Sequence, residues 1–247
     1  MRRHLTGMAD ETDADGLIAD QIAYYRARAG EYDKDLRRLE RYVSLGGSVA
    51  GRSDDEDGKE VATLLGALER MGSFDTALEL ACGTGWWTQW LAQHAGHVTA
   101  VDAAEEMLEL NRERVNAANV RYILADVFSW RPDRQFDLVF FAFWMSHVPH
   151  DRFAAFWQLV RDSLAVNGQV FFIDEMKRPW SQETRVDDDA VLRQLADGRQ
   201  FRAVKVFYEP SELEEKLRRL WWDIVVRRAG RRFYWGQRVV TEGHQKL

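Results

Sequence analysis

Apolar and polar positions alternate in blocks through the middle of the chain. Short apolar runs are separated by stretches in which apolar residues recur every three or four positions. The runs predict strands and the stretches predict amphipathic helices. The expected strands are 76–82, 97–102, 120–124, 136–143 and 168–174, and the expected helices are 86–94, 104–117 and 151–165. Strands that alternate with helices over short links indicate a parallel sheet with helices on both faces.

The first sixty residues show a different pattern. Residues 1–16 are polar and acidic, so we expect a disordered N-terminal arm there. Residues 17–59 begin with aromatic and apolar residues at helical spacing, broken near Gly30, and end in a polar loop. They are expected to form a helical cap and a linker. The main domain is then expected to span residues 60–247.

The pattern changes again after Glu175. Residues 176–200 are polar and broken by turn residues, which is typical of a lid or a substrate-facing insertion. A strand is expected over 201–208 and a helix over 210–220, followed by two closing strands joined near Gly230. This ending fits a mixed sheet with an antiparallel edge strand.

Composition narrows the class of protein. The 247 residues carry a formal net charge of −6, which argues against non-specific binding to nucleic acid. The single cysteine, Cys82, allows no disulfide within the chain and favours a reducing compartment. The chain shows neither the apolar core of a secretory signal nor an apolar run of membrane-spanning length. We therefore expect a cytoplasmic monomer or homodimer that binds neither membrane nor nucleic acid.

Candidate chemistry begins at "ALELACGTGWW", residues 77–87, where a predicted strand runs into a helix. Gly83 and Gly85 allow positive φ and a close approach of ligand to backbone. Asp102 ends the next predicted strand, where a carboxylate can bind the hydroxyls of a ribose. A dinucleotide-binding loop would have a third glycine at position 88, but the residue there is Thr88. The bulky tryptophans before it favour a smaller, positively charged nucleoside.

These motifs, with three more in the same order, resemble the class I S-adenosylmethionine (SAM)-dependent methyltransferases of the bacterial small-molecule type. The matching segments are "LELACGTG", "VTAVDAAEEMLELNRER", "VRYILADVF", "QFDLVFFAFWMSHVP" and "SLAVNGQVFFIDE". The resemblance implies an α/β fold: a Rossmann-like, seven-stranded, mostly parallel sheet with an antiparallel edge strand, helices on both faces and an N-terminal helical cap. It also implies SAM as cofactor and S-adenosylhomocysteine (SAH) as product.

The resemblance further implies which residues bind the cofactor. Arg28 would pair with its carboxylate, Asp102 would hold its ribose, and Phe143 would border its sulfonium. The full expected set is Tyr24, Arg28, Glu79, Ala81, Gly83, Thr84, Gly85, Asp102, Ala103, Met107, Asp126, Val127 and Phe143. We expect no metal, because three consecutive carboxylates at 187–189 do not converge in either a helix or a strand.

The acceptor side is less specific. His147 follows the fourth predicted strand and is the best candidate for a catalytic base, although a histidine there can also simply orient a loop. Aromatic walls for a substrate are expected from Trp86, Trp144 and Trp180, which can equally be core residues. The predicted function is methyl transfer by in-line displacement to N or O of a small acceptor, most simply an aromatic or heteroaromatic secondary metabolite.

Three alternatives stay open at this stage. A nucleotide-dependent oxidoreductase can have a similar fold, although Thr88 argues against it. A methyltransferase that acts on a macromolecule is a second alternative, and the acidic charge argues against it. The third is a binding protein that kept the cofactor site without turnover, and the fold alone does not exclude it.

Overall fold

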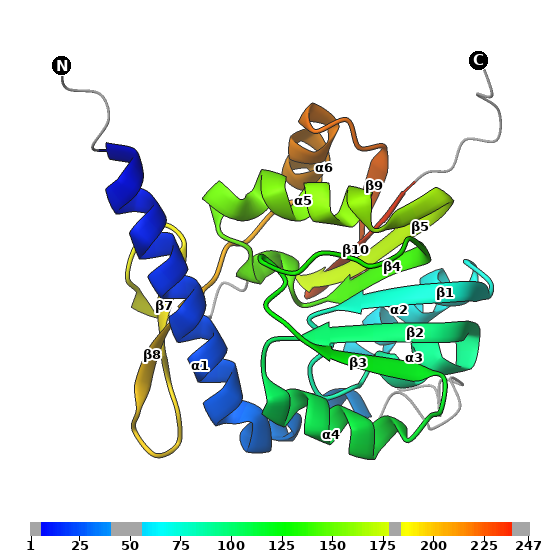
Figure 1. Ribbon diagram of the computed structural model, residues 1–247, viewed down its shortest axis with the longest axis horizontal. Helices are drawn as coiled ribbons and strands as arrows, with labels where there is room; N and C mark the ends of the chain where they lie inside the picture. Colours follow the sequence, from blue (N-terminus) through cyan, green and yellow to red (C-terminus); the bar gives the residue numbers. More distant parts are fainter. Residues whose placement is uncertain (1–5, 41–55, 178–183, 239–247) are drawn as a thin grey trace.

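The computed structural model describes residues 6–40, 56–177 and 184–238. A seven-stranded sheet forms its centre (Figure 1), in the order β3-β2-β1-β4-β5-β10-β9. The strands are β1 Phe74–Leu80, β2 Ala95–Asp102, β3 Val120–Leu124, β4 Phe136–Ala142, β5 Leu164–Glu175, β9 Ile224–Arg228 and β10 Phe233–Arg238. The pairs among β1 to β5 are parallel, whereas β10 runs antiparallel to both β5 and β9. The predicted fold class is confirmed.

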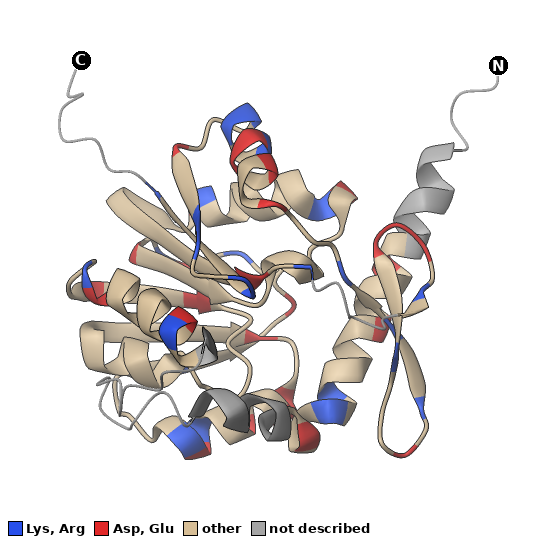
Figure 2. Cartoon of the chain, turned by 180° about the vertical axis from the view of Figure 1, so that it is seen from behind, with Lys and Arg blue, Asp and Glu red and all other residues tan. Residues whose placement is uncertain are grey.

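Helices cover both faces of this sheet because its central strands are apolar on both sides. Along β5, Val170 and Phe172 point into the cluster beneath α5 and α6, while Phe171 and Ile173 point into the cluster beneath α2 and α3. Successive side chains of a strand alternate between faces, so a continuous apolar run needs cover on both. The helices are α2 Glu56–Glu69, α3 Thr88–His94, α4 Glu105–Val115, α5 Phe153–Asp162 and α6 Pro210–Arg219. Figure 2 shows that the helices and loops carry most of the charged residues.

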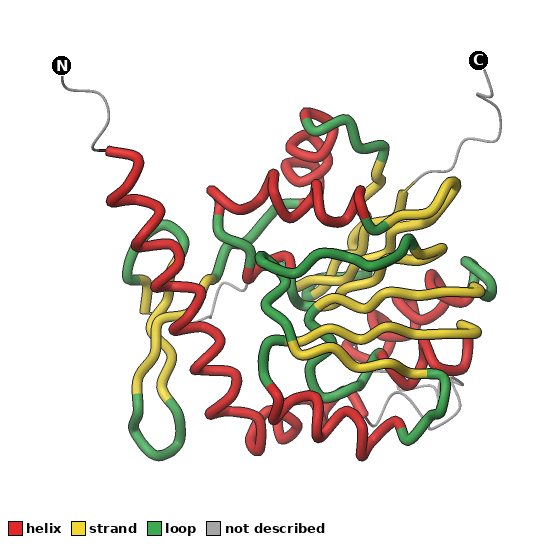
Figure 3. Tube along the Cα trace, viewed as in Figure 1, coloured by secondary structure: helices red, strands yellow, loops and turns green. Residues whose placement is uncertain are grey.

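A second layer lies across the carboxyl ends of the parallel strands. It consists of the long helix α1, Thr6–Glu40, and a three-stranded sheet formed by β6 Thr184–Arg185, β7 Ala190–Gln194 and β8 Gln200–Val204. Figure 1 shows α1 beside β7 and β8, and Figure 3 shows the loops of the central sheet facing this helix. Helix α1 and this small sheet pack against each other, and Tyr24 clusters there with Leu195 and Ala203.

The structure differs from the sequence predictions at three places. Helix α1 runs through Gly30 without a break and includes residues 6–16, where an arm was expected. The segment expected as a strand of the central sheet from 201 to 208 instead pairs with β7 in the small sheet and ends at Val204. Local periodicity predicts that a segment is extended but does not specify which strand it pairs with. Within the described residues, no helix is long and apolar enough to cross a membrane.

Candidate active site

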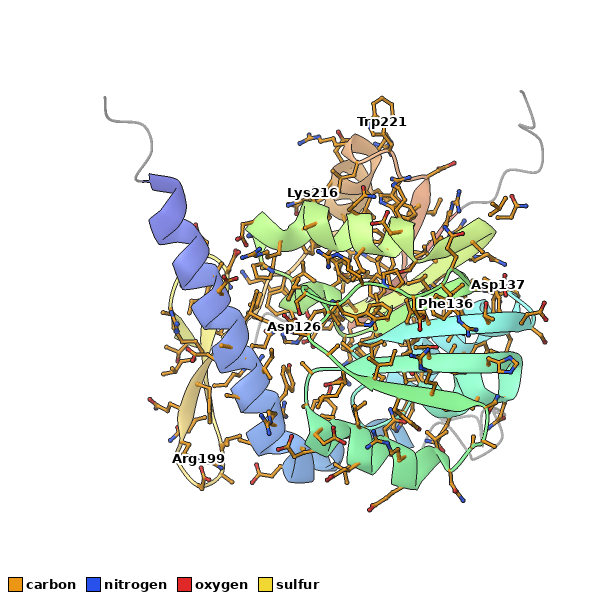
Figure 4. All side chains as sticks on the ribbon, viewed as in Figure 1. Asp126, Phe136, Asp137, Arg199, Lys216 and Trp221 are labelled. Atoms are coloured by element: carbon orange, nitrogen blue, oxygen red, sulfur yellow. The ribbon has the colours of Figure 1, made fainter. Side chains whose placement is uncertain are left out.

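A pocket opens where the strand ends of the central sheet meet α1. It encloses about 670 Å³ of empty space when its open mouth is counted. Its lining has two parts, one formed mainly by residues that follow the strands of the central sheet and one formed mainly by residues of α1. The strand half is lined by Ala81, Gly83, Asp102, Ala103, Ala104, Met107, Asp126, Val127, Ala142 and Phe143, and the helix half by Ile18, Gln21, Ile22, Tyr25, Tyr32, Trp144 and His147. Figure 4 shows Asp126 at the sheet edge that faces α1.

The two glycines of the loop after β1 have different reasons to be glycine. Gly83 lines the pocket with φ of 53°, and a Cβ added there would meet nothing within 4 Å. Gly85, with φ of 88°, packs so tightly on Asn111 that a Cβ would fall 2.5 Å from its Oδ1 atom. Gly83 therefore leaves room for a ligand, whereas Gly85 lets the loop pack against α4.

A buried hydrogen-bond network holds this loop from behind. The Thr88 hydroxyl donates to the Glu79 carboxylate at 2.6 Å, and the Asn111 side-chain amide donates to Thr88 at 2.9 Å and to the Gly83 carbonyl at 3.1 Å. Burial raises the pKa of Glu79 to about 8, although the Thr88 hydrogen bond acts to lower it. A positive charge placed near Glu79 would favour the ionised carboxylate.

Asp102 lies at the end of β2 and faces both the loop and the pocket. Its carboxylate accepts hydrogen bonds from the Gly83 N–H at 2.8 Å and the Ala104 N–H at 2.9 Å. Burial raises its pKa, against the opposing effect of these backbone donors. A carboxylate already fixed by two backbone groups presents its remaining lone pairs in one direction, which suits it to bind a pair of hydroxyls.

The backbone is strained on both sides of the pocket. Ala81 and Phe143 have φ of 53° and 55°, in the left-handed region that side chains other than glycine rarely adopt. Such a conformation costs about 1–3 kcal/mol per residue, and it persists only where the surroundings enforce it. Here it turns the ends of β1 and β4 away from the sheet, so that both residues line the pocket.

His147 is buried in the helix half, and its hydrogen bonds define its tautomer. Its Nδ1 atom lies 2.8 Å from the Val204 carbonyl oxygen, and its Nε2 atom lies 3.0 Å from the Tyr25 hydroxyl. A carbonyl can only accept, so Nδ1 carries the proton. In the neutral ring Nε2 is then an acceptor, and the Tyr25 hydroxyl donates to it. The Tyr25 oxygen keeps its lone pairs for a ligand.

The surroundings keep this pair uncharged. Burial, with the positive charges of Lys205, Arg193 and Arg28, holds the pKa of His147 well below its ordinary value. Burial raises the pKa of Tyr25 well above its usual range. The pair is therefore a neutral imidazole beside a neutral phenol at physiological pH, in a positive environment.

Gln21 connects the three segments that carry the pair. Its Oε1 atom accepts from the Val204 N–H at 3.0 Å, and its Nε2 atom donates to the His147 carbonyl at 3.3 Å. Both ends of this buried amide are used, so α1, the turn at Met145–His147 and β8 are held together. The histidine is thus held in part by Gln21, which lies 126 positions away in the sequence.

The pocket includes many of the residues predicted from the sequence. Those that line it are Ala81, Gly83, Asp102, Ala103, Met107, Asp126, Val127, Phe143, Trp144 and His147. Those that do not line it are Tyr24, Arg28, Glu79, Thr84, Gly85 and Trp86. Tyr24 packs against Phe201, and Trp86 packs edge-on against Trp87 beneath the sheet. Trp180 lies outside the described residues.

Sequence reasoning missed the face of α1 that lines the pocket. Its residues are Ile18, Gln21, Ile22, Tyr25 and Tyr32. Successive residues of this set are one, three or seven positions apart, which places all five in one stripe on one face of the helix, and the sequence contains this pattern. The sequence prediction chose Tyr24, which is one residue, or about 100° around the helix, away from this stripe. Periodicity defines the stripe but does not tell whether it faces a ligand or a core.

Comparisons with known proteins agree with this geometry. Residues 77–168 match a family model described as a methyltransferase domain. DhpI in complex with SAH is 38% identical to this chain with a TM-score of 0.76, and the match covers 90% of this chain and 96% of DhpI. DhpI solved with SAM and HEP is equally similar in sequence, with a TM-score of 0.72 and coverage of 90% and 97%.

Two curated relatives match over shorter lengths. Phosphoethanolamine N-methyltransferase of Triticum aestivum is 28% identical over 169 residues, which is 66% of this chain and 32% of the wheat protein. Demethylmenaquinone methyltransferase of Listeria welshimeri is 32% identical over 117 residues, which is 43% of this chain and 48% of that protein. The matches thus span a third to a half of the length of these relatives.

Proposed function

Because the chain belongs to the class I SAM-dependent methyltransferases, with SAM as cofactor, we propose that it transfers a methyl group to an oxygen of a small acidic molecule. When bound, SAM supplies an electrophilic methyl group. The residues of the strand half suit an adenosyl group: Gly83 leaves room beside the backbone, Asp102 presents a fixed carboxylate, and Met107 offers an apolar surface. The helix half is then left for the acceptor.

The charge around the helix half supports an acidic acceptor. Lys205, Arg193 and Arg28 all act on the buried His147 ring, although the chain as a whole is acidic. The Arg28 guanidinium lies 5.3 Å from the ring centre of Tyr32, which lines the pocket. Although Lys205 is paired with Glu175, these three cations act together on the His147 ring, and such a field favours a negatively charged ligand. This positive environment is the observation that carries the proposal.

The Tyr25–His147 pair supplies a route for a proton. An acceptor oxygen that still carries hydrogen can donate to the Tyr25 oxygen, while the Tyr25 proton passes to Nε2 of His147. The acceptor O–H bond breaks, an N–H bond forms on the imidazole, and the phenol is restored. The negative charge of the acceptor offsets the surrounding cations, so protonation of His147 costs less once the acceptor is bound.

A neutral aromatic acceptor is the second candidate. The rings of Tyr25, Tyr32, Phe143 and Trp144 line the pocket, and a flat molecule would gain contact with them. DhpI has been solved in one complex with SAM and HEP, which supports the binding of a cofactor together with a small molecule in this fold. It does not decide between the two candidates.

Matched pairs of acceptors separate the candidates. SAH formation is measured with a panel of small carboxylic and phosphoryl acids that also carry a free hydroxyl, each beside the neutral amide or ester that keeps this hydroxyl as an acceptor. The proposal expects turnover with acids and not with their neutral partners. Turnover that follows ring size and ignores charge would favour the aromatic candidate, and the absence of turnover with every acid would contradict the acidic one.

A further inference from the structure

A buried lysine stands behind the histidine of the helix half. Lys205 follows β8 directly, and only 3% of its side chain is exposed. Its Nζ atom donates to the Ser146 hydroxyl at 3.0 Å and is paired with the Glu175 carboxylate. Ser146 precedes His147 in the chain, and Glu175 ends β5. The lysine therefore joins the strand end of the central sheet to the turn that carries the histidine.

The backbone around Lys205 is bound to the same turn. Val204, one residue before it, offers the carbonyl that accepts from Nδ1 of His147 at 2.8 Å. Val206, one residue after it, donates its N–H to the Ser146 carbonyl at 2.8 Å. Moving Lys205 would thus move the group that selects the histidine tautomer.

A second buried charge completes this anchor. Asp174 is fully buried on β5, and its carboxylate accepts from the Ser146 N–H at 2.8 Å and the Glu175 N–H at 2.7 Å. Burial raises the pKa of Asp174 to about 6, while the charge of Lys205 acts to lower it. Lys205 is thus paired with Glu175, and its charge acts on both the Asp174 carboxyl and the His147 imidazole. A buried lysine has a high desolvation cost and persists only where such partners offset it.

We propose that Lys205 is a positioning residue for His147, which fixes the Val204 carbonyl and opposes a proton on the ring so that Nε2 stays an acceptor facing Tyr25. The role rests on the proposed function only in calling His147 the base. Lys205 itself lies outside the residues that line the pocket. Groups that orient a working histidine from behind commonly decide its tautomer and basicity.

Other charged groups besides Lys205 also act on the His147 ring. The titratable and charged side chains that face His147 or its anchor are Tyr25 and Arg28 from α1, Arg193 from β7, Lys205 after β8, and Asp174 and Glu175 from β5. Lys205 and Asp174 both contact Ser146, the residue next to His147, and Lys205 is the one of these two whose charge opposes a proton on the ring. Its removal should therefore change both the charge on the ring and its placement.

The test reads the histidine directly and needs no acceptor. Enzyme labelled with ¹³C and ¹⁵N in histidine is titrated by NMR with and without SAH, and the H147Q variant identifies the His147 signals. The variants are K205R, which keeps charge and donors, K205Q, which keeps a donor without charge, and K205M, which keeps neither. K216M is the matched control, because Lys216 lies on α6 over the Phe153 ring and away from Asp126 at the pocket (Figure 4).

The wild type and K216M should show an Nδ1-protonated ring that does not titrate in the neutral range. In K205Q and K205M, His147 should titrate about one pH unit higher than in the wild type, and K205M should also show a mixture of His147 tautomers. In K205R, His147 should behave as in the wild type. If K205M does not fold, K205Q decides. A His147 titration unchanged in K205Q, or an Nε2-protonated ring in the wild type, would overturn the inference. Neither result depends on which molecule is methylated, so the proposed function would be judged separately.

Discussion

The two halves of the pocket are built in different ways. The polar contacts of the strand half join residues that lie close in sequence, such as Asp102 with Gly83, nineteen positions apart. Those of the helix half join distant segments: Tyr25 to His147 spans 122 positions and Gln21 to Val204 spans 183. The strand half is thus a local product of consecutive strand–helix units, whereas the helix half exists only once the whole chain has folded.

This difference assigns different work to the two halves. Backbone groups and one fixed carboxylate at strand ends suit a ligand common to many proteins of this fold. Side chains from α1 and the turn at 145–147, held in place by the backbone of β8, suit the part of the chemistry that is particular to this protein. Changes in one half should therefore leave the function of the other intact.

The largest effect is expected from His147→Ala. Loss of the base should lower kcat by about 10²–10⁴-fold on an acid whose acceptor oxygen carries a proton, because general-base catalysis contributes about that much. The Kd for SAH, measured by calorimetry, should stay within about twofold, since the strand half is untouched. Y25F should show the same pattern with a smaller loss of kcat. A large rise in the Kd for SAH of either variant would show that the helix half also binds the cofactor, which would contradict the division into two halves.

Asp102→Ala is the converse change. It removes the carboxylate expected to hold the ribose and releases the Gly83 and Ala104 N–H groups. Affinity for SAH should fall by about 100-fold or more, since hydrogen bonds to a charged group contribute about 1.5–3 kcal/mol each. The His147 NMR signals should keep their wild-type titration. An unchanged SAH affinity would remove Asp102 from the cofactor site.

The sequence predicts the strand half of the site better than the helix half. "LELACGTG" and Asp102 predicted the strand half because its geometry is set within single strand–loop–helix units. His147 was predicted as a candidate, but neither its tautomer nor Tyr25 was, because Val204 and α1 reach it only through the tertiary fold. The small sheet was missed for the same reason, since strand pairing depends on distant partners.

A smaller effect is expected from Gln21→Met, which tests the assembly of the helix half. The variant keeps the volume of the side chain but leaves the Val204 N–H and the His147 carbonyl without their partner. Turnover should fall about tenfold, the equivalent of about 1.4 kcal/mol, without a change in SAH affinity. The control is Gln158→Met, an exposed residue of α5 whose side-chain amide donates to the Asp162 carboxylate within the same helix. Equal turnover in both variants would show that α1 needs no such link.

The smallest effect concerns Glu79 and pH. Its pKa is raised from 4.5 to about 8 in the folded chain. Between these values the folded state holds a proton that the unfolded state has lost, so the free energy of unfolding should fall as pH rises from 5 to 8. The slope from this one group is at most about 1.4 kcal/mol per pH unit. Urea unfolding at several pH values should give a flatter slope for E79Q than for the wild type. Identical slopes would show that Glu79 is ionised in the folded protein.

A crystal structure of the protein with SAH tests the central division most directly. The ribose should lie on the Asp102 carboxylate, and the sulfur should point toward the space bounded by Tyr25 and His147, with Nδ1 of His147 still on the Val204 carbonyl. SAH bound in the helix half, or bound with its sulfur turned away from His147, would contradict the account.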